Sequence, residues 1–226
     1  MADRGIAFSD PMVRALLDRR KQQTRRLLSL RGHRTFSEFG PSDTPGYDWH
    51  FRRADGCWCD FHTADLPLPY APGDRLYVLE AYYQFGHWEP VEGVLTKGGR
   101  QKWAFIGACQ MVRFDEPGEY RKAMNREFPG VPCWYKRLGR FMPREFSRMF
   151  LVVTDVRVER VAAISEADAR AEGLGDQELH GMEARGWFRD LWNSLHTAEG
   201  ERWEDNPWVV AITFDVRRGN IDEVAG

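Results

Sequence analysis

Alternating hydrophobic and polar positions predict several β-strands along the chain. The clearest alternation lies within residues 148–161, where Val156 and Val158 share one face and Arg157 and Glu159 share the other. This pattern is typical of a strand with one face against a core. Three further segments are expected to be extended: residues 24–30, 75–82 and 207–216.

Helical spacing and end signals predict three helices, at residues 10–20, 166–172 and 183–196. Ser9 and Asp10 can cap the first helix, and Pro11 suits its first turn. Gly173 stands where glycine commonly ends a helix. The third helix is amphipathic, with one apolar stripe: Trp187, Phe188, Leu191, Trp192 and Leu195.

Two long regions, about 31–66 and 84–140, show no clean period and are rich in glycine, proline and aromatic residues. We expect them to be insertions, largely loops, carrying at most short strands. Strands separated by short helices and long insertions favour a compact mixed α/β barrel over a doubly wound parallel sheet. The chain, residues 1–226, is expected to form a single domain. It has no GxGxxG, P-loop or GxSxG motif, which argues against those three chemistries.

The composition is that of a folded, water-soluble protein. Of 226 residues, 42% are hydrophobic and 29% charged, and no apolar run approaches the length of a membrane span. The first residues lack the apolar segment of a secretory leader. We therefore expect a cytoplasmic protein, in a bacterium or a phage-infected cell, with no membrane partner and no obvious protein partner.

Four cysteines are too few for a disulfide framework in a chain of this length, so reduced thiols are expected: Cys57, Cys59, Cys109 and Cys133. The spacing of Cys57, Cys59 and His62 is not one of the common zinc-ligand spacings. We expect neither a metal nor a cofactor.

The net charge is only −2, but the charges are unevenly distributed. Residues 1–34 carry nine Lys and Arg against three Asp, and residues 119–148 carry eight basic against three acidic residues. In residues 159–205 the sign reverses, with twelve acidic and five basic residues. These blocks are either solvated faces that balance on folding or local sites for an anion, since salt screens charges beyond about 8 Å.

Lys21, Thr24 and Glu172 form a candidate catalytic group. Lys21 and Thr24 are three residues apart at the end of the first helix, and if its last turn persists, both side chains lie on one face. A threonine hydroxyl is a weak nucleophile without a base, and lysine serves as a base only if its pKa is lowered by burial or by nearby cations. Glu172 could orient the amine or carry a proton. Alternatively, the first two residues are a solvated helix end and Glu172 a surface charge.

Four blocks of the sequence, in this order, resemble the ASCH group of the PUA-like superfamily: DPMVRALLDRRKQQTRR, PYAPGDRLYVLEAYY, FMPREFSRMFLVVTDVRVERVAAISEADARAEGL and NPWVVAITFDV. The similarity is greatest to a subgroup frequent in phage and prophage genomes. The blocks cover less than half of the chain and leave both insertions outside. The resemblance implies a PUA-like β-barrel with flanking helices, in a superfamily that binds RNA and modified bases.

Within that family, Lys21, Thr24 and Glu172 match the Lys, Thr and Glu of small bacterial enzymes that hydrolyse the amide of N4-acetylcytidine. The resemblance thus implies an amidohydrolase of an N-acylated nucleobase, free or in nucleic acid. Thr24 would be the nucleophile, Lys21 its base and Glu172 the orienting group. This chain reads RRKQQ where the family commonly has glycine and threonine, and it is about twice as long. Both departures bear on the identity of the substrate more than on the assignment of Lys21, Thr24 and Glu172.

Five arginines are the candidate contacts to substrate or to phosphate groups, which guanidinium groups bind bidentately: Arg20, Arg25, Arg26, Arg144 and Arg148. Their stems could equally cover apolar surface. Three tryptophans have core spacing: Trp187, Trp192 and Trp208. Five lie in the insertions, where they could anchor loops or stack on bases: Trp49, Trp58, Trp88, Trp103 and Trp134.

Two other functions remain open. A non-catalytic module could bind RNA or a modified base with the same basic rim, and it needs only a positive groove and an aromatic shelf. A ribonuclease would need a cluster of metal-binding carboxylates, and no single block of the sequence supplies one.

Overall fold

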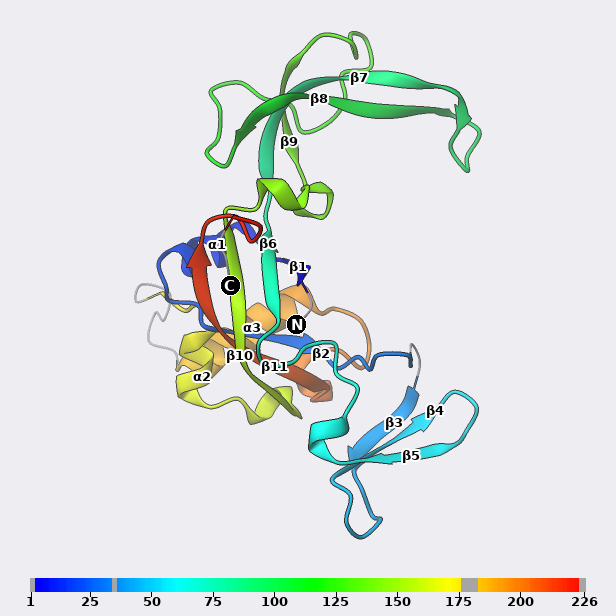
Figure 1. Ribbon diagram of the computed structural model, residues 1–226, viewed down its shortest axis with the longest axis vertical. Coiled ribbons are helices and arrows are strands. Elements are labelled where there is room, and N and C mark those ends of the chain that lie inside the picture. The colour runs from blue at the N-terminus through cyan, green and yellow to red at the C-terminus, as the bar shows by residue number, and fades with distance from the viewer. Residues whose placement is uncertain (1–2, 34–35, 176–182, 224–226) are drawn as a thin grey trace. The chain divides into compact units, whose positions relative to one another are not determined.

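The computed structural model describes residues 3–33, 36–175 and 183–223, and it is a mixed α/β structure made mostly of strands (Figure 1). Three α-helices lie in the described part: α1 (Asp10–Leu17), α2 (Glu166–Ala171) and α3 (Ala184–Leu195). The strands are β1 (Asp3–Ala7), β2 (Gln23–Leu27), β3 (Phe36–Pro41), β4 (Trp49–Arg53), β5 (Trp58–Phe61), β6 (Arg75–Leu79), β7 (Tyr82–Leu95), β8 (Gln101–Arg113), β9 (Cys133–Arg137), β10 (Met149–Arg160) and β11 (Trp208–Arg218).

The strands form three sheets, with the orders β1-β6-β10-β11-β2, β3-β4-β5 and β8-β7-β9. The predicted strands at 75–82, 148–161 and 207–216 correspond to β6, β10 and β11, which are neighbours in the first sheet. None of the three sheets of described strands closes on itself, so the structure has open sheets where the sequence predicted a barrel.

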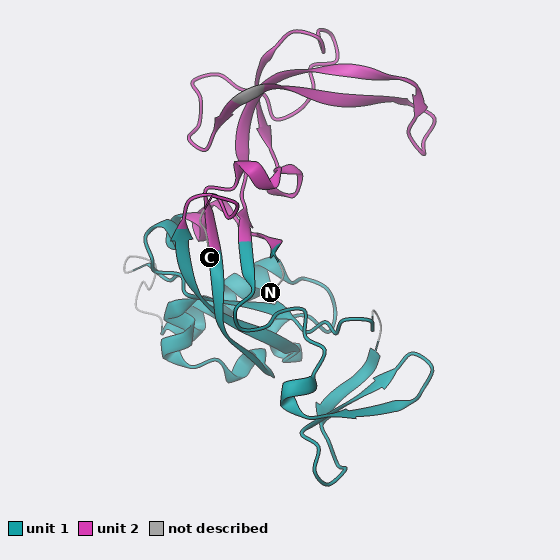
Figure 2. Cartoon of the chain, viewed as in Figure 1, with its two compact units in different colours: residues 1–3, 14–76, 151–217 teal, residues 4–13, 77–150, 218–226 magenta. Residues whose placement is uncertain are grey.

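The chain divides into two compact units (Figure 2). The first comprises residues 1–3, 14–76 and 151–217, and the second comprises residues 4–13, 77–150 and 218–226. The single domain expected from the sequence stays a prediction. One division falls inside α1 and the others fall inside strands, so composition along the chain gives no linker signal at these points.

The core of the first unit forms where α3 packs on β2 and β11. Phe188 and Trp192 are 3% exposed and pack with Val209 of β11, while Leu27 of β2 borders the same cluster. These contacts confirm the predicted apolar stripe of the third helix at Trp187, Phe188, Leu191 and Trp192, whereas Leu195 is 60% exposed. Burial of this stripe, more than helix propensity, stabilises a twelve-residue helix.

The first helix ends earlier than predicted. It stops at Leu17, and Arg19 takes a left-handed conformation with φ of 60°. Lys21 then forms an isolated antiparallel bridge with Glu172, and β2 begins at Gln23. The expectation that Lys21 and Thr24 share a helix face is therefore wrong.

Both insertions contain sheets rather than long loops. In the first unit, β3-β4-β5 buries Phe51 with Phe61 stacked on it at 5.3 Å between ring centres. In the second unit, β7 pairs with β8 and β9. The register of the β7–β8 pair shifts between Gln84 and Gly86 and again after Pro90, and such irregularities erase the alternation that identifies strands in a sequence.

Candidate functional site

A buried ion pair joins two of the three predicted catalytic residues. The Lys21 Nζ lies 2.7 Å from Glu172 Oε2 and 2.7 Å from the Glu172 main-chain oxygen. The two residues are 2% and 3% exposed. The bridge between them, together with the Gln22 N–H that donates to Ala171 O at 2.8 Å, holds the start of β2 against the end of α2.

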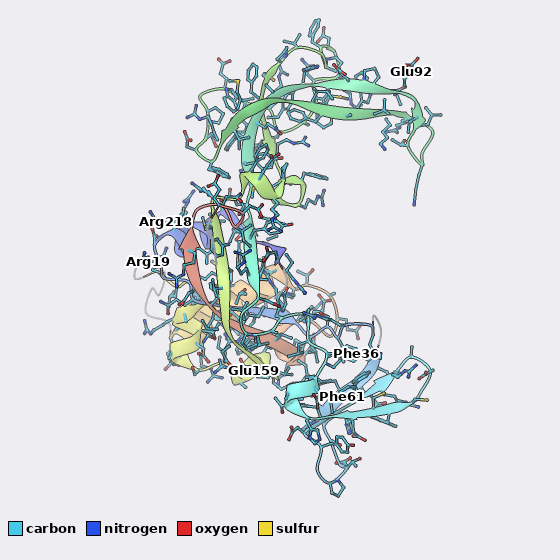
Figure 3. The ribbon with its side chains drawn as sticks, viewed as in Figure 1. Arg19, Phe36, Phe61, Glu92, Glu159 and Arg218 are labelled. Carbon is cyan, nitrogen blue, oxygen red and sulfur yellow. The ribbon has the colours of Figure 1, made fainter. Side chains whose placement is uncertain are left out.

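Arg25 connects this pair to two more carboxylates. Its Nη1 lies 3.0 Å from Glu172 Oε1, its Nε 2.9 Å from Glu159 Oε1, and its Nη2 3.3 Å from Asp168 Oδ2. The side chain has no exposed surface. Glu159, labelled in Figure 3, comes from the end of β10, whereas Asp168 and Glu172 come from α2 and its C-terminal residue.

Gln23 completes the network from the same strand as Arg25. Its Nε2 donates to Asp168 Oδ1 at 2.9 Å, and its Oε1 accepts from Arg25 Nη1 at 3.2 Å. The pKa of Asp168 is lowered: its partial burial would raise it, but the Gln23 hydrogen bond and the charges of Arg25 and Arg157 outweigh that effect. We name Lys21, Gln23, Arg25, Glu159, Asp168 and Glu172 the buried charge cluster.

Burial sets the protonation chemistry of Lys21. Loss of hydration lowers the pKa of its amine below the ordinary value of 10.5, Glu172 opposes the shift, and the charges of Arg26 and Arg25 add to the lowering. A buried lysine with a lowered pKa beside a carboxylate is a recurrent feature of functional sites. Such an amine can accept a proton at a pH at which an exposed lysine cannot.

Thr24 is not joined to this pair. The side chains of Gln23 and Arg25 both reach α2, so alternation along β2 directs Thr24 between them to the opposite face of the sheet. Thr24 is 4% exposed, and in the described part of the chain no hydrogen bond is made by its hydroxyl.

A pocket of about 300 Å³ opens beside Gln22 in the first unit, lined by Arg19, Gln22, Phe214, Asp215, Val216 and Arg217. Arg19 is labelled in Figure 3. Thr24 pairs with Ile212, and the Phe214 N–H donates to Gln22 O at 3.0 Å. The pocket thus lies two residue pairs away from Thr24 along β2 and β11, although Thr24 is not part of its lining.

The five arginines predicted to contact substrate or phosphate are placed differently from one another. Arg25 is buried among carboxylates, and Arg26 is half-buried on the alternate face of β2. Arg20 Nη1 donates to Gly173 O at 2.6 Å. In the second unit, Arg144 Nε lies 3.0 Å from Asp222, and Arg148 binds both oxygens of Glu80 at 2.9 and 2.8 Å. Arg20 Nη2 also lies 3.1 Å from Asp18 Oδ2, so carboxylates bind the guanidinium groups of Arg20, Arg25, Arg144 and Arg148.

The predicted core tryptophans pack as expected. Trp187 and Trp192 border the α3 core, and Trp208 contacts Phe39 and Trp49 at 5.4 and 5.5 Å between ring centres.

The other five predicted tryptophans make different contacts. Trp49 stacks on Phe39 at 5.3 Å, Trp58 is 49% exposed beside His50, and Trp88 and Trp134 contact Phe105 and Phe85. Trp103 lines a separate pocket on β8.

No group of three or more His, Cys, Asp or Glu side chains suited to a metal ion occurs among the described residues. Cys57, Cys59 and Cys133 are free thiols. In the described part of the chain, no helix combines the length and apolar character needed to cross a membrane. Comparisons with protein-family models, with curated proteins and with solved structures found no match.

Sequence reasoning missed Glu159 and Asp168 as members of the site. Glu159 was placed on the outward face of its strand, and Asp168 has the ordinary position of an acidic residue in the first turn of a helix. The available signal was in β2. Gln23 and Arg25 are two residues apart in a strand, so their side chains share one face, and a buried arginine on that face needs acidic partners.

Proposed function

We propose that this chain is an ASCH-type amidohydrolase with a PUA-like arrangement, acting on an N-acylated nucleobase such as N4-acetylcytidine. The observation that carries the proposal is the buried contact of Lys21 with Glu172, in which burial lowers the pKa of the lysine. The two residues are the pair that the family resemblance identifies as a base and its orienting group.

In the proposed reaction Thr24 Oγ1 attacks the acyl carbon, a C–O bond forms, and the C–N bond of the amide breaks. Lys21 takes the hydroxyl proton and returns it to the exocyclic nitrogen of the leaving base. Water then hydrolyses the acyl-threonine and releases the carboxylic acid. Because Thr24 lies on the other face of β2 and the Lys21 amine is buried, this step requires substrate binding to bring the Thr24 hydroxyl within hydrogen-bond reach of the amine.

Glu172 and Arg25 have positioning roles in this mechanism. One carboxylate oxygen of Glu172 binds the lysine and the other binds Arg25 Nη1 at 3.0 Å, so the carboxylate cannot rotate away from the amine. The pocket beside Gln22 offers space for a base close to the strand that carries Thr24.

The test is turnover of a panel of N4-acylated cytidines and deoxycytidines, read by mass spectrometry. Thr24→Val nearly preserves volume and removes the hydroxyl, while Thr24→Ser keeps a nucleophile. We expect Thr24→Val and Lys21→Met to lose about a thousandfold or more in turnover, with losses that do not add in the double variant. Thr24→Ser should keep measurable turnover.

Lys21 and Thr24 are both buried, so substitution of either can affect the fold. Each variant therefore needs a denaturation midpoint beside its rate. Equal turnover of wild type and Thr24→Val, with equal stability, would contradict the nucleophile; no turnover by wild type on any acylated nucleoside would contradict the enzyme.

One observation favours a second candidate, a non-catalytic module that binds a nucleoside or RNA. Within the described residues Thr24 makes no hydrogen bond to Lys21 or Glu172, and the charges of the buried charge cluster are satisfied by one another. A module of this kind would bind its ligand equally well in wild type and Thr24→Val and hydrolyse none.

A further inference from the structure

A second pocket lies in the second unit, on the hairpin that β7 and β8 form. Its volume is about 430 Å³, within the roughly 300–1,000 Å³ of small-molecule sites. It is lined by Arg100, Gln101, Trp103, Met124 and Arg126. These residues belong to the insertion that the ASCH-like blocks leave uncovered.

The local backbone places Arg100 at the start of β8. Gly99 has φ of 73°, and the tight turn is closed by Gly99 N–H to Thr96 O at 2.9 Å and Thr96 N–H to Arg100 O at 2.7 Å. Arg126 follows Asn125, whose side chain accepts the Glu127 N–H at 3.1 Å. Both arginines thus project from hydrogen-bonded turns.

The two guanidinium groups have charge to offer a ligand. Arg100 and Arg126 are exposed, and neither binds a carboxylate in the described part of the chain. The five residues that line the pocket include these two arginines and no acidic residue. The lining itself is therefore positively charged.

Trp103 supplies a flat apolar surface beside these cations. It is half-buried, and it shares a face of β8 with Phe105, two residues along. Phe105 contacts Trp88 at 5.3 Å between ring centres, so this face of the sheet is aromatic next to the pocket. The Gln101 amide is held by Val91 O and Lys102 O at 2.9 and 2.8 Å, which leaves the arginines as the main polar groups for a ligand.

We propose that this pocket binds a nucleotide of a single-stranded nucleic acid, with the base stacked on Trp103 and the phosphates on Arg100 and Arg126. Aromatic platforms beside arginines are how proteins hold single strands without reading sequence, and arginine matches phosphate geometry bidentately. The site stands independently of the proposed hydrolase activity. If both hold, it brings polymer substrates to the enzyme.

The test is fluorescence anisotropy with a labelled oligouridine of about 12 nucleotides, titrated at several salt concentrations. The variant Arg100→Ala/Arg126→Ala removes two cations from the pocket. The matched control is Arg52→Ala/Arg53→Ala, which changes the net charge equally at exposed residues of β4 that are paired with Glu38 and Asp55.

We expect the pocket variant to bind at least about tenfold more weakly at low salt. The slope of log K against log salt should flatten by about one to two units. The control should match wild type, and Trp103→Leu should weaken binding while keeping the wild-type slope. A pocket variant that keeps wild-type affinity and slope, or wild type that binds no oligonucleotide, overturns the proposal.

Two further measurements distinguish a polymer from a free nucleotide at this pocket, and this site from the proposed hydrolase. Displacement of the oligonucleotide by uridine monophosphate at an equal nucleotide concentration would assign the pocket to a free nucleotide and overturn the polymer. Turnover of an acylated nucleoside by the pocket variant reports on the hydrolase alone. Wild type without turnover, but with oligonucleotide binding that depends on Arg100 and Arg126, would contradict the proposed function and support this site.

Discussion

The amine of Lys21 is enclosed by protein, and its burial makes the stability of the fold depend on pH. Its pKa in the folded chain is lower than the ordinary 10.5, so between these two values the unfolded chain binds more protons than the folded one. Below the lowered pKa, burial of the charged amine reduces the free energy of unfolding by its whole cost. As the pH rises towards 10.5 the amine in the folded chain loses its proton, and the free energy of unfolding increases.

We therefore predict that Lys21→Met changes the pH dependence of stability. Between neutral pH and pH 10.5, wild type should gain free energy of unfolding relative to Lys21→Met, because only wild type carries the titrating amine. Urea denaturation at a series of pH values measures the difference. The lowered pKa would be contradicted if the difference in free energy of unfolding between the two proteins did not change with pH. An increase in the relative stability of Lys21→Met as pH rises would also contradict it.

Arg25 offers a second prediction at the scale of one residue. Arg25→Met should lower the free energy of unfolding by about 3–5 kcal/mol, because it removes a buried cation that binds three carboxylates. Arg157→Ala is the matched control. Arg157 contacts the same Asp168 at 3.3 Å, but its side chain is 44% exposed, so its loss should cost no more than about 1 kcal/mol. If guanidinium denaturation showed equal losses of free energy of unfolding for Arg25→Met and Arg157→Ala, the prediction that burial strengthens the contacts of Arg25 would be wrong.

At the scale of elements, the turn after α2 places Glu172 against Lys21. Gly173 has φ of 109°, and a Cβ built there would lie 2.9 Å from Ala15 Cβ and 3.2 Å from Lys21 Cβ. Glycine is needed for the conformation and for the close approach of the chain segments.

Gly173→Ala should accordingly destabilise the fold by more than Gly200→Ala. Gly200 also has a positive φ, of 81°, but a Cβ there meets no atom within 4 Å. We expect about 1 kcal/mol for Gly200→Ala from the backbone alone, and roughly 3 kcal/mol or more for Gly173→Ala, from the backbone and the clash together. Thermal denaturation of both variants measures the contrast. The prediction is wrong if Gly173→Ala destabilises the fold less than Gly200→Ala does.

The elements that the sequence predicted well are those with one buried face. The strand at 148–161, the helix at 183–196 and the helix end at Gly173 each follow from a local pattern, and the structure has β10, α3 and the positive φ of Gly173 there. The two insertions were not predictable as sheets. Their strands are short or irregular, and aromatic pairs such as Phe39 with Trp49 stabilise them by contacts between strands.

The site was predictable only in part for a related reason. Lys21 and Glu172 were named from the family resemblance, and the structure places them in contact. Arg25 was expected at the surface, because a block of basic residues has no property in the sequence that shows which one is buried. Its position depends on carboxylates more than 130 residues away, which no local pattern encodes.

At the scale of the whole molecule, the two compact units are not separated by a linker. The chain crosses the division within β6 between Leu76 and Tyr77, within β10 between Phe150 and Leu151, and within β11 after Arg217. A strand that loses its hydrogen bonds at one end weakens the pairing of the rest of the strand.

We predict from this continuity that the chain unfolds in one cooperative transition. Far-ultraviolet circular dichroism and tryptophan fluorescence should give coincident urea midpoints. Gly173→Ala, in the first unit, should shift both signals together. Two separated transitions, or a shift in one signal alone, would contradict the prediction.

The shared guanidinium of Arg25 has a consequence for how this protein can change over evolutionary time. Glu159, Asp168 and Glu172 all bind the same group, so the loss of one carboxylate alters the charge felt by the other two. Single substitutions at these positions are expected to be deleterious until a second change restores neutrality. Among diverging descendants of this chain, position 25 should therefore vary together with positions 159 and 168, and neutral drift should proceed there by paired exchanges.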